Sequence, residues 1–163
     1  MNKPLPITEY MELAYRRRGE LINQTIMIER AMEQYLVQHF CTESDRQIEL
    51  LETLLSTTHV SFFAKLEVVI IILERHDPTF LYAYPDVKKE LTDIMEQRNI
   101  IAHSVLDFSN IMRNNANSKI VVTKYRGKKP KPIEYDEKRF NNLIILINKY
   151  GAAFYHWKRV LFP

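Results

Sequence analysis

Glycine is scarce in this chain of 163 residues, which contains only Gly19, Gly127 and Gly151. No two of them lie close enough in sequence to build the glycine-rich loop that cradles phosphates in Rossmann and P-loop proteins. Nucleotide binding through such a loop is therefore nearly excluded.

Cysteine and long apolar runs are also scarce. The one cysteine, Cys41, cannot form an internal disulfide, and the first residues, Met1 to Pro4, lack the apolar stretch of a signal peptide. The most apolar run, Val68 to Leu73, is far shorter than the roughly 18 residues that suggest a membrane span. These absences predict a soluble, cytoplasmic protein with no membrane partner.

Net charge is small, at +3, which is less than nucleic-acid-binding domains usually carry. Its distribution is uneven, because residues 113–139 hold nine basic and three acidic side chains. The composition, with 46% hydrophobic and 26% charged residues, is that of an ordinary globular protein with a core. The length suits one compact domain over residues 1–163.

Apolar residues at helical spacing predict a long first helix to about Phe40, with Thr8 as a candidate N-cap and Gly19 as a candidate bend. A polar break at residues 42–45 has capping chemistry, and a short second helix is expected after it. Residues 61–74 follow, with apolar side chains on nearly every side, so we expect the most buried helix there.

The β-branched run Val68 to Ile72 is compatible with a strand. A helix is favoured because the run lies inside a segment without turn residues. Breaks at residues 76–78 and 84–86 precede another helix over residues 86–102.

Residues 119–135 have the pattern of a β-hairpin with a basic tip. Asp136 is then a candidate N-cap for a last helix to about Val160. The expected fold class is mainly α, a bundle of four to five helices with a small β-hairpin inserted before the last helix.

The segment with most chemical content lies at the end of the helix over residues 86–102, where Arg98, Asn99 and His103 occur. Five residues correspond to about 140° around an ideal helix, so Arg98 and His103 do not share a face. Glu96, Asn99 and His103 do fall along one line. For Arg98 and His103 to act on one phosphate, the helix must end or distort between them, or a second subunit must complete the site.

RNA cleavage requires proton transfer from the 2′-hydroxyl group, proton transfer to the leaving oxygen, and stabilisation of charge on phosphorus. Histidine suits the proton steps because its pKa is near neutrality, and arginine suits the charge because it is always cationic. A purely structural interpretation also exists, in which Arg98 extends from the bundle surface and His103 interacts with the dipole at the helix end.

The stretch over residues 96–104, Glu-Gln-Arg-Asn-Ile-Ile-Ala-His-Ser, resembles the signature of HEPN-domain proteins, in which an arginine followed by a polar residue precedes a histidine by four to six positions. The resemblance implies a helical bundle that dimerises around a shared cleft and, in many members, metal-independent endoribonuclease activity, often in toxin–antitoxin or antiphage systems. It implies that Arg98 stabilises phosphate charge, His103 transfers protons and Asn99 orients the phosphate or the histidine. Glu96 is not part of the signature and is an accessory candidate because it shares the predicted face.

The basic hairpin is a second candidate surface, since lysines and arginines bind the RNA backbone. Its candidate contacts are Lys124, Arg126, Lys128, Lys129 and Lys131. The alternative is that these side chains only keep an exposed hairpin soluble. No cofactor or metal is expected, because His39 and Cys41 have no second metal-binding pair nearby in sequence.

The expected partners are RNA, a second copy of the chain and a protein antitoxin or regulator. Two other functions stay open beside the ribonuclease. One is a non-catalytic HEPN-like module that binds nucleic acid or a protein. The other is a transcriptional regulator similar to the mannitol operon repressor family, although no basic recognition helix is evident.

Overall fold

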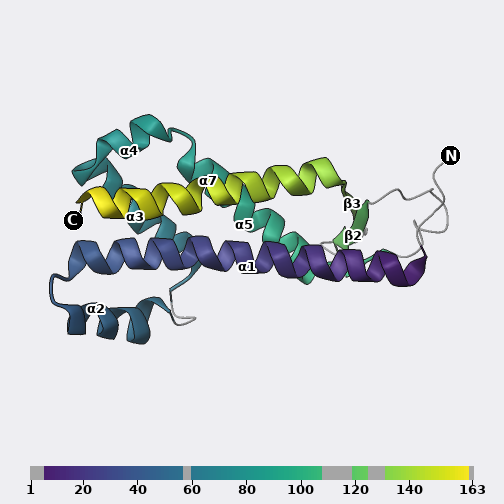
Figure 1. Cartoon of the computed structure of the whole chain (residues 1–163), viewed down its shortest axis with the longest axis horizontal. Coiled ribbons are helices and arrows are strands. Elements are labelled where there is room, and N and C mark those ends of the chain that lie inside the picture. Colours follow the sequence, from purple (N-terminus) through teal and green to yellow (C-terminus); the bar gives the residue numbers. More distant parts are fainter. Residues whose placement is uncertain (1–5, 57–59, 108–118, 125–130, 162–163) are drawn as a thin grey trace. The chain divides into compact units, whose positions relative to one another are not determined.

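The computed structural model describes residues 6–56, 60–107, 119–124 and 131–161, with side chains described as far as residue 155. Its helices are α1 (Ile7–Phe40), α2 (Ser44–Leu50), the π-helix η1 (Leu51–Leu55), α3 (Phe62–His76), α4 (Pro78–Ala83), α5 (Val87–His103) and α7 (Glu137–Leu161) (Figure 1). Its strands are β1 (Val105–Leu106), β2 (Ile120–Lys124) and β3 (Lys131–Tyr135). The predicted mainly α fold class, with a small β-hairpin before the last helix, is confirmed.

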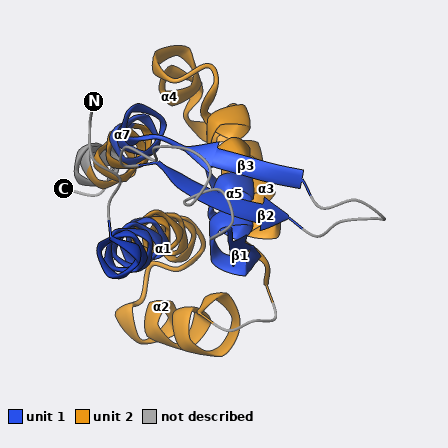
Figure 2. Cartoon of the chain, turned by 90° about the vertical axis from the view of Figure 1, so that its right-hand side faces the viewer, with its two compact units in different colours: residues 1–24, 94–145 blue, residues 25–93, 146–163 orange. Residues whose placement is uncertain are grey.

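The chain divides into two compact units (Figure 2). Unit 1 comprises Met1–Gln24 and Ile94–Ile145, and unit 2 comprises Thr25–Asp93 and Leu146–Pro163. Helices α1, α5 and α7 each contribute residues to both units. The single domain over residues 1–163 stays a prediction.

Unit 2 is helical, and aromatic and aliphatic side chains fill its core. Phe80 of α4 stacks on Phe154 of α7, with ring centroids 5.3 Å apart, and Tyr35 of α1 lies 6.3 Å from the same ring. The aliphatic part of this core includes Ile28, Met32, Leu66, Val69, Leu73 and Leu91, each no more than 2% exposed. The helical spacing of these residues explains why the segments that carry them coil rather than extend.

Helix α3 confirms the helical prediction for the β-branched run, and its N-cap is Ser61, whose Oγ accepts a hydrogen bond from the Ala64 amide. The sequence pattern predicted that this helix would be the most buried one. In the structure, part of its surface is exposed. One side is buried, but Phe63, Val68 and Ile71 are 40%, 38% and 43% exposed.

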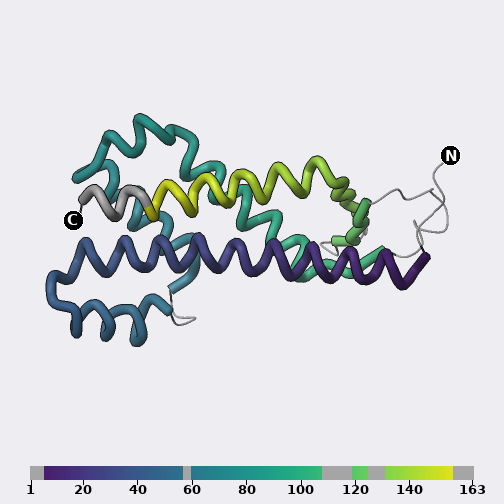
Figure 3. The backbone as a smooth tube through the Cα atoms, in the orientation of Figure 1, coloured from purple at the N-terminus to yellow at the C-terminus, as the bar shows by residue number. Residues whose placement is uncertain are grey.

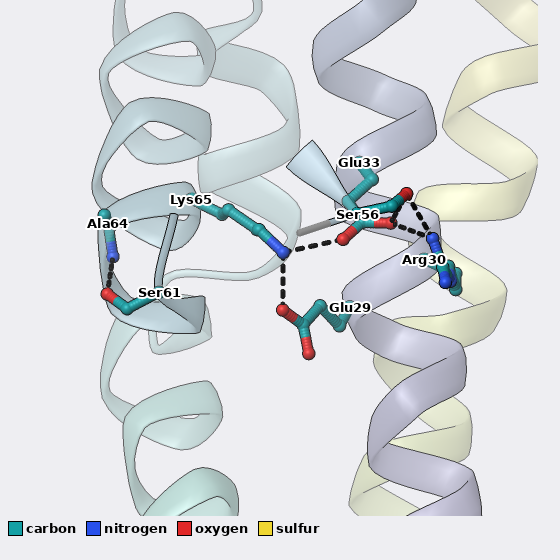
Figure 4. A network of polar contacts seen from close by, with 7 residues as sticks. All are labelled: Glu29, Arg30, Glu33, Ser56, Ser61, Ala64 and Lys65. Carbon is teal, nitrogen blue, oxygen red and sulfur yellow. Dashed lines mark hydrogen bonds and ion pairs between the residues drawn. The ribbon is translucent and has the colours of Figure 1, made fainter. Parts of the chain in front are cut away.

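A buried polar network lies between α1 and α3 within unit 2 (Figure 4). Lys65, only 2% exposed, places its Nζ 2.6 Å from Glu29 Oε1 and 2.6 Å from Glu33 Oε1. The other carboxylate oxygen of Glu33 accepts a hydrogen bond from Arg30, which also contacts Ser56. Each buried charge therefore has an opposite charge beside it.

The short helix expected after residues 42–45 is present, and its coils follow those of α1 along the chain (Figure 3). Its type changes along its length. Helix α2 passes into the π-helix η1, where the Ser56 amide donates to the carbonyl of Leu51, five residues earlier. The expected capping is not observed at its N-cap, Glu43, whose side chain forms no capping hydrogen bond.

Unit 1 contains a three-stranded antiparallel sheet in the order β1, β2, β3. The predicted hairpin pairs Ile120 with Tyr135 at one end and Lys124 with Lys131 at the other. Strand β1 pairs with the other edge of β2, and this strand was not predicted because two residues are too few to show alternation. Tyr10 of α1 accepts a hydrogen bond from the Val121 amide at 2.9 Å, which attaches β2 to the helix.

The two long terminal helices differ in how well their starts were predicted. Asp136 is confirmed as an N-cap, because its Oδ1 accepts a 2.7 Å hydrogen bond from the Arg139 amide. The cap expected at Thr8 is wrong: α1 already begins at Ile7, and the Tyr10 amide bonds to the carbonyl of Pro6. The helix is assigned without a break through Gly19. No helix in the described residues is both long and apolar enough to cross a membrane.

Candidate functional site

The candidate residues lie on the last two turns of α5, inside unit 1. Ile94 and Ile101 are buried and anchor this part of the helix, which leaves the side chains between them on other faces. The last helical hydrogen bond joins the Ser104 amide to the carbonyl of Ile100 at 3.0 Å. The chain then enters β1 at once, because Val105 pairs with Thr123 of β2. Sheet pairing therefore fixes where the helix ends.

The backbone between Arg98 and His103 is regular α-helix, and His103 is its last residue. Of the two ways in which Arg98 and His103 could act on one phosphate, an end or distortion of the helix between them is therefore not observed. Their Cα positions keep the separation of about 140° that an ideal helix gives. Any shared action on one phosphate depends on side-chain reach or on a second copy of the chain.

The Arg98 side chain is directed toward its neighbour. Its Nη1 donates a 2.9 Å hydrogen bond to Asn99 Oδ1. Asn99 precedes His103 by four residues, so it lies one turn away on the same face. The guanidinium of Arg98 is thus linked, through Asn99, to the face that presents His103.

The buried Nε of Arg98 has no hydrogen-bond partner within the described residues. A buried N–H group without a partner is costly, and an acceptor that approached this edge of the guanidinium would relieve the cost. Arg98 and Asn99 are both partly exposed.

Glu96 and His103 are exposed, and both lie on the face that Asn99 shares. Within the described part of the chain, Glu96 forms no ion pair. The predicted line of Glu96, Asn99 and His103 is therefore preserved, because α5 is a regular helix across all three.

Arg18 of α1 is a neighbour of the site that the motif did not reveal. Its Nη2 donates a 2.9 Å hydrogen bond to the carbonyl of Ser104, the residue after His103. A cation at this position satisfies a free carbonyl and interacts favourably with the negative end of the helix dipole. The sequence signal was the run Arg16–Arg18 in the first helix, but only the fold connects it to α5.

Gln97 ties the same turns to the hairpin and to α7. Its Oε1 accepts hydrogen bonds from the Tyr135 hydroxyl and from Arg139 Nη2, each at 2.8 Å. Arg139 also lies over the Tyr135 ring, 4.4 Å from its centroid. Burial raises the pKa of Tyr135, and the positive charge of Arg139 offsets part of that rise, so the hydroxyl stays a proton donor at neutral pH.

The predicted RNA-binding surface is described only in part. Lys131 is exposed and Lys124 is partly exposed, and the two are direct cross-strand partners. Like charges placed opposite each other are destabilising, so a bound anion would stabilise this pair. The other three candidates, Arg126, Lys128 and Lys129, lie outside the described residues.

Metal-ligating side chains do not gather in the described residues, where no group of three or more His, Cys, Asp or Glu side chains could hold an ion. His39 packs against His76 instead, with ring centroids 5.0 Å apart. The sequence did not reveal this pair, since 37 positions separate the two residues. Comparison of the chain with models of known protein families, with curated proteins and with solved structures found no match.

Proposed function

We propose that this chain is a metal-independent endoribonuclease of the HEPN type, with Arg98, Asn99 and His103 as its active residues. The observation that carries the proposal is the hydrogen bond from Arg98 to Asn99, which brings a permanent cation toward the face that presents His103. Together with the resemblance of residues 96–104 to the HEPN signature, this arrangement supplies a charge-stabilising group and a proton-transfer group on neighbouring turns.

The proposed reaction is attack by the ribose 2′-oxygen on the adjacent phosphorus. A neutral His103 accepts the 2′-hydroxyl proton, or a protonated His103 donates a proton to the departing 5′-oxygen. The P–O bond to the 5′-oxygen breaks, which leaves a 2′,3′-cyclic phosphate and a 5′-hydroxyl. Arg98 stabilises the extra negative charge on the phosphate oxygens as the transition state forms.

One histidine cannot accept one proton and donate another in the same step, so a second group is required. We propose that a second copy of the chain supplies it across a shared cleft. Arg18, Lys124 and Lys131 would hold neighbouring phosphates, and Glu96 would assist His103 from the same face. The resemblance also favours a cytoplasmic toxin–antitoxin or antiphage role with a protein antitoxin or regulator.

The direct test incubates the purified chain with total RNA in EDTA and compares it with His103→Ala, Arg98→Ala and Asn99→Ala. His76→Ala is a matched control, because His76 is also an exposed histidine at the last position of a helix. Arg46→Ala controls for loss of a helical arginine. We expect cleavage by the wild type and both controls, and a loss of about 100-fold or more in the three site variants.

The cleavage products give a further check, since the proposed chemistry must leave a cyclic phosphate that a terminal-phosphate assay can identify. If wild-type protein binds RNA but leaves it intact, the non-catalytic HEPN-like module is the better description. If the site variants cut as fast as the wild type, the activity does not reside at this site.

A further inference from the structure

The exposed side of α3 carries several large apolar side chains. Phe63, Val68 and Ile71 are each about two-fifths exposed, and Ala64 between them is exposed as well. Large apolar side chains grouped on one helix face mark interaction sites more often than isolated ones do. The question is which partner would cover this face.

Three exposed charged residues lie on this side of α3, Glu67, Glu74 and Arg75, and two of them are placed symmetrically about Ile71. Glu67 and Arg75 lie four residues before and four residues after Ile71, and all three are exposed. Steps of four residues keep them along one stripe of the helix. At 1.5 Å per residue, each charge lies about 6 Å along the axis from Ile71, with the negative charge on one side and the positive on the other.

The charges of one α3 are complementary to those of a second, antiparallel α3. If a second α3 runs antiparallel, with a two-fold axis at Ile71, then Glu67 lies at the same height as Arg75 of the partner subunit. The reverse contact follows from the same axis, as in any isologous interface. A parallel pair would instead place like charges opposite each other.

We propose that α3 forms a homodimer interface in which two copies of the helix pair antiparallel around Ile71. The proposal does not depend on the ribonuclease function. Arg75 forms no ion pair within the described residues, so its charge is available to a partner. Glu67 is held by Lys88 of α5 at 2.9 Å, but both side chains are more than half exposed. A second cation can therefore share the carboxylate at little cost.

Site-specific cross-linking tests the position of the axis. In a Cys41→Ser background, Ile71→Cys places two thiols at the two-fold axis, where a disulfide can form between closely packed helices. Ile26→Cys is the matched control, because Ile26 is 44% exposed and Ile71 is 43% exposed. We expect oxidation to trap the Ile71→Cys protein as a covalent dimer and to leave the Ile26→Cys protein as single chains. Equal trapping of both, or trapping of neither, would overturn the proposal.

Charge exchange tests the antiparallel register by sedimentation velocity. Glu67→Arg and Arg75→Glu each create two like-charge contacts, and we expect either change to raise the dimer Kd about tenfold. The double variant restores opposite charges and should return the Kd to near the wild-type value. A monomeric wild type, or a double variant as weak as the single ones, would rule out this interface. The changed positions are exposed, and circular dichroism would show that each variant is folded.

Discussion

At the scale of single residues, Lys65 shows how the fold accommodates a buried charge. Its ammonium group lies 2.6 Å from two carboxylates, those of Glu29 and Glu33, and Glu33 is itself only 2% exposed. Burying an ion removes its hydration, so the network is tolerated only because each charge has partners. The sequence pattern of α3 did not predict that Lys65 is buried, because a lysine among apolar residues is normally expected to face solvent.

Lys65→Met should therefore be strongly destabilising. It would leave Glu33 buried with Arg30 as its remaining cation, and we expect a loss of about 3 kcal/mol in the free energy of unfolding. Lys88→Met removes the exposed pair with Glu67 and should cost less than about 1 kcal/mol. Urea denaturation of both variants measures the difference. Equal losses in the free energy of unfolding would show that the buried Lys65 network contributes no more to stability than the exposed Lys88 pair.

Tyr35 should make stability depend on alkaline pH. Burial, with a further contribution from the negative charge of Asp77, raises the pKa of Tyr35 to about 12 from its ordinary value near 10. Below pH 10 the hydroxyl is protonated in both folded and unfolded chains, so its full contribution to the free energy of unfolding is present. Between pH 10 and pH 12 the unfolded chain loses the proton first, and stability falls as pH rises.

Between pH 9 and pH 11.5 the predicted loss from Tyr35 is about 2 kcal/mol, and Tyr35→Phe should remove it. Tyr82→Phe is the control, because Tyr82 is 92% exposed. Unfolding free energies measured at pH 9 and at pH 11.5 give the comparison. A Tyr35→Phe protein with the same alkaline decline as the control would contradict the assignment.

At the scale of elements, the helix caps expected from the sequence had different outcomes. Asp136 was expected to cap the last helix, and its carboxylate does so. Thr8 was expected to cap the first helix, but α1 begins at Ile7 and already includes Thr8. A capping residue indicates a helix start only when the preceding backbone offers no alternative, and at α1 the Pro6 carbonyl accepts the first helical bond.

Asp136→Ala should cost about 1 kcal/mol, because the Arg139 amide would lose its acceptor at the start of α7. Asp136→Asn keeps a capping oxygen and should be nearly neutral. Glu43→Ala is a useful comparison at the start of α2, where no side-chain cap bond exists and little change is expected. Thermal unfolding would measure all three, and an alanine variant as stable as the asparagine variant would count against the cap.

Other elements were beyond prediction for physical reasons. The π-helix η1 depends on hydrogen bonds shifted by one residue, for which Leu51 to Leu55 carries no compositional signal. Strand β1 forms because its two residues pair with the free edge of β2. Strand β1 is decided by its contact with a distant segment, whereas the hairpin of β2 and β3 and the helices have periodic patterns of their own.

At the scale of the whole molecule, the regular geometry of α5 makes a shared site testable. His103→Ala and Arg98→Ala chains should each be inactive alone. If the cleft combines Arg98 of one copy with His103 of another, mixing the two variants under conditions of subunit exchange rebuilds intact sites. Half of the dimers are then mixed and half of their sites complete, so about a quarter of the wild-type cleavage rate should return.

An absence of recovery, with both variants folded and dimeric, would exclude a site that is completed by only Arg98 of one copy and His103 of the other. Mixing His103→Ala with Asn99→Ala gives a second comparison, because these residues share a face and belong to the same half of the proposed cleft. That mixture should stay inactive.

The sequence by itself determined the fold class, the approximate extents of the long helices and the hairpin, and the face on which Glu96, Asn99 and His103 lie. These features follow from periodicity and local capping, which act over a few residues. Only the tertiary structure decided that Arg98 turns toward Asn99, that Arg18 reaches the end of α5, that Lys65 is buried between carboxylates and that α3 keeps an apolar face exposed. Each of these features depends on contacts across long sequence separations or on side-chain packing. Neither kind of interaction produces a local pattern in the sequence.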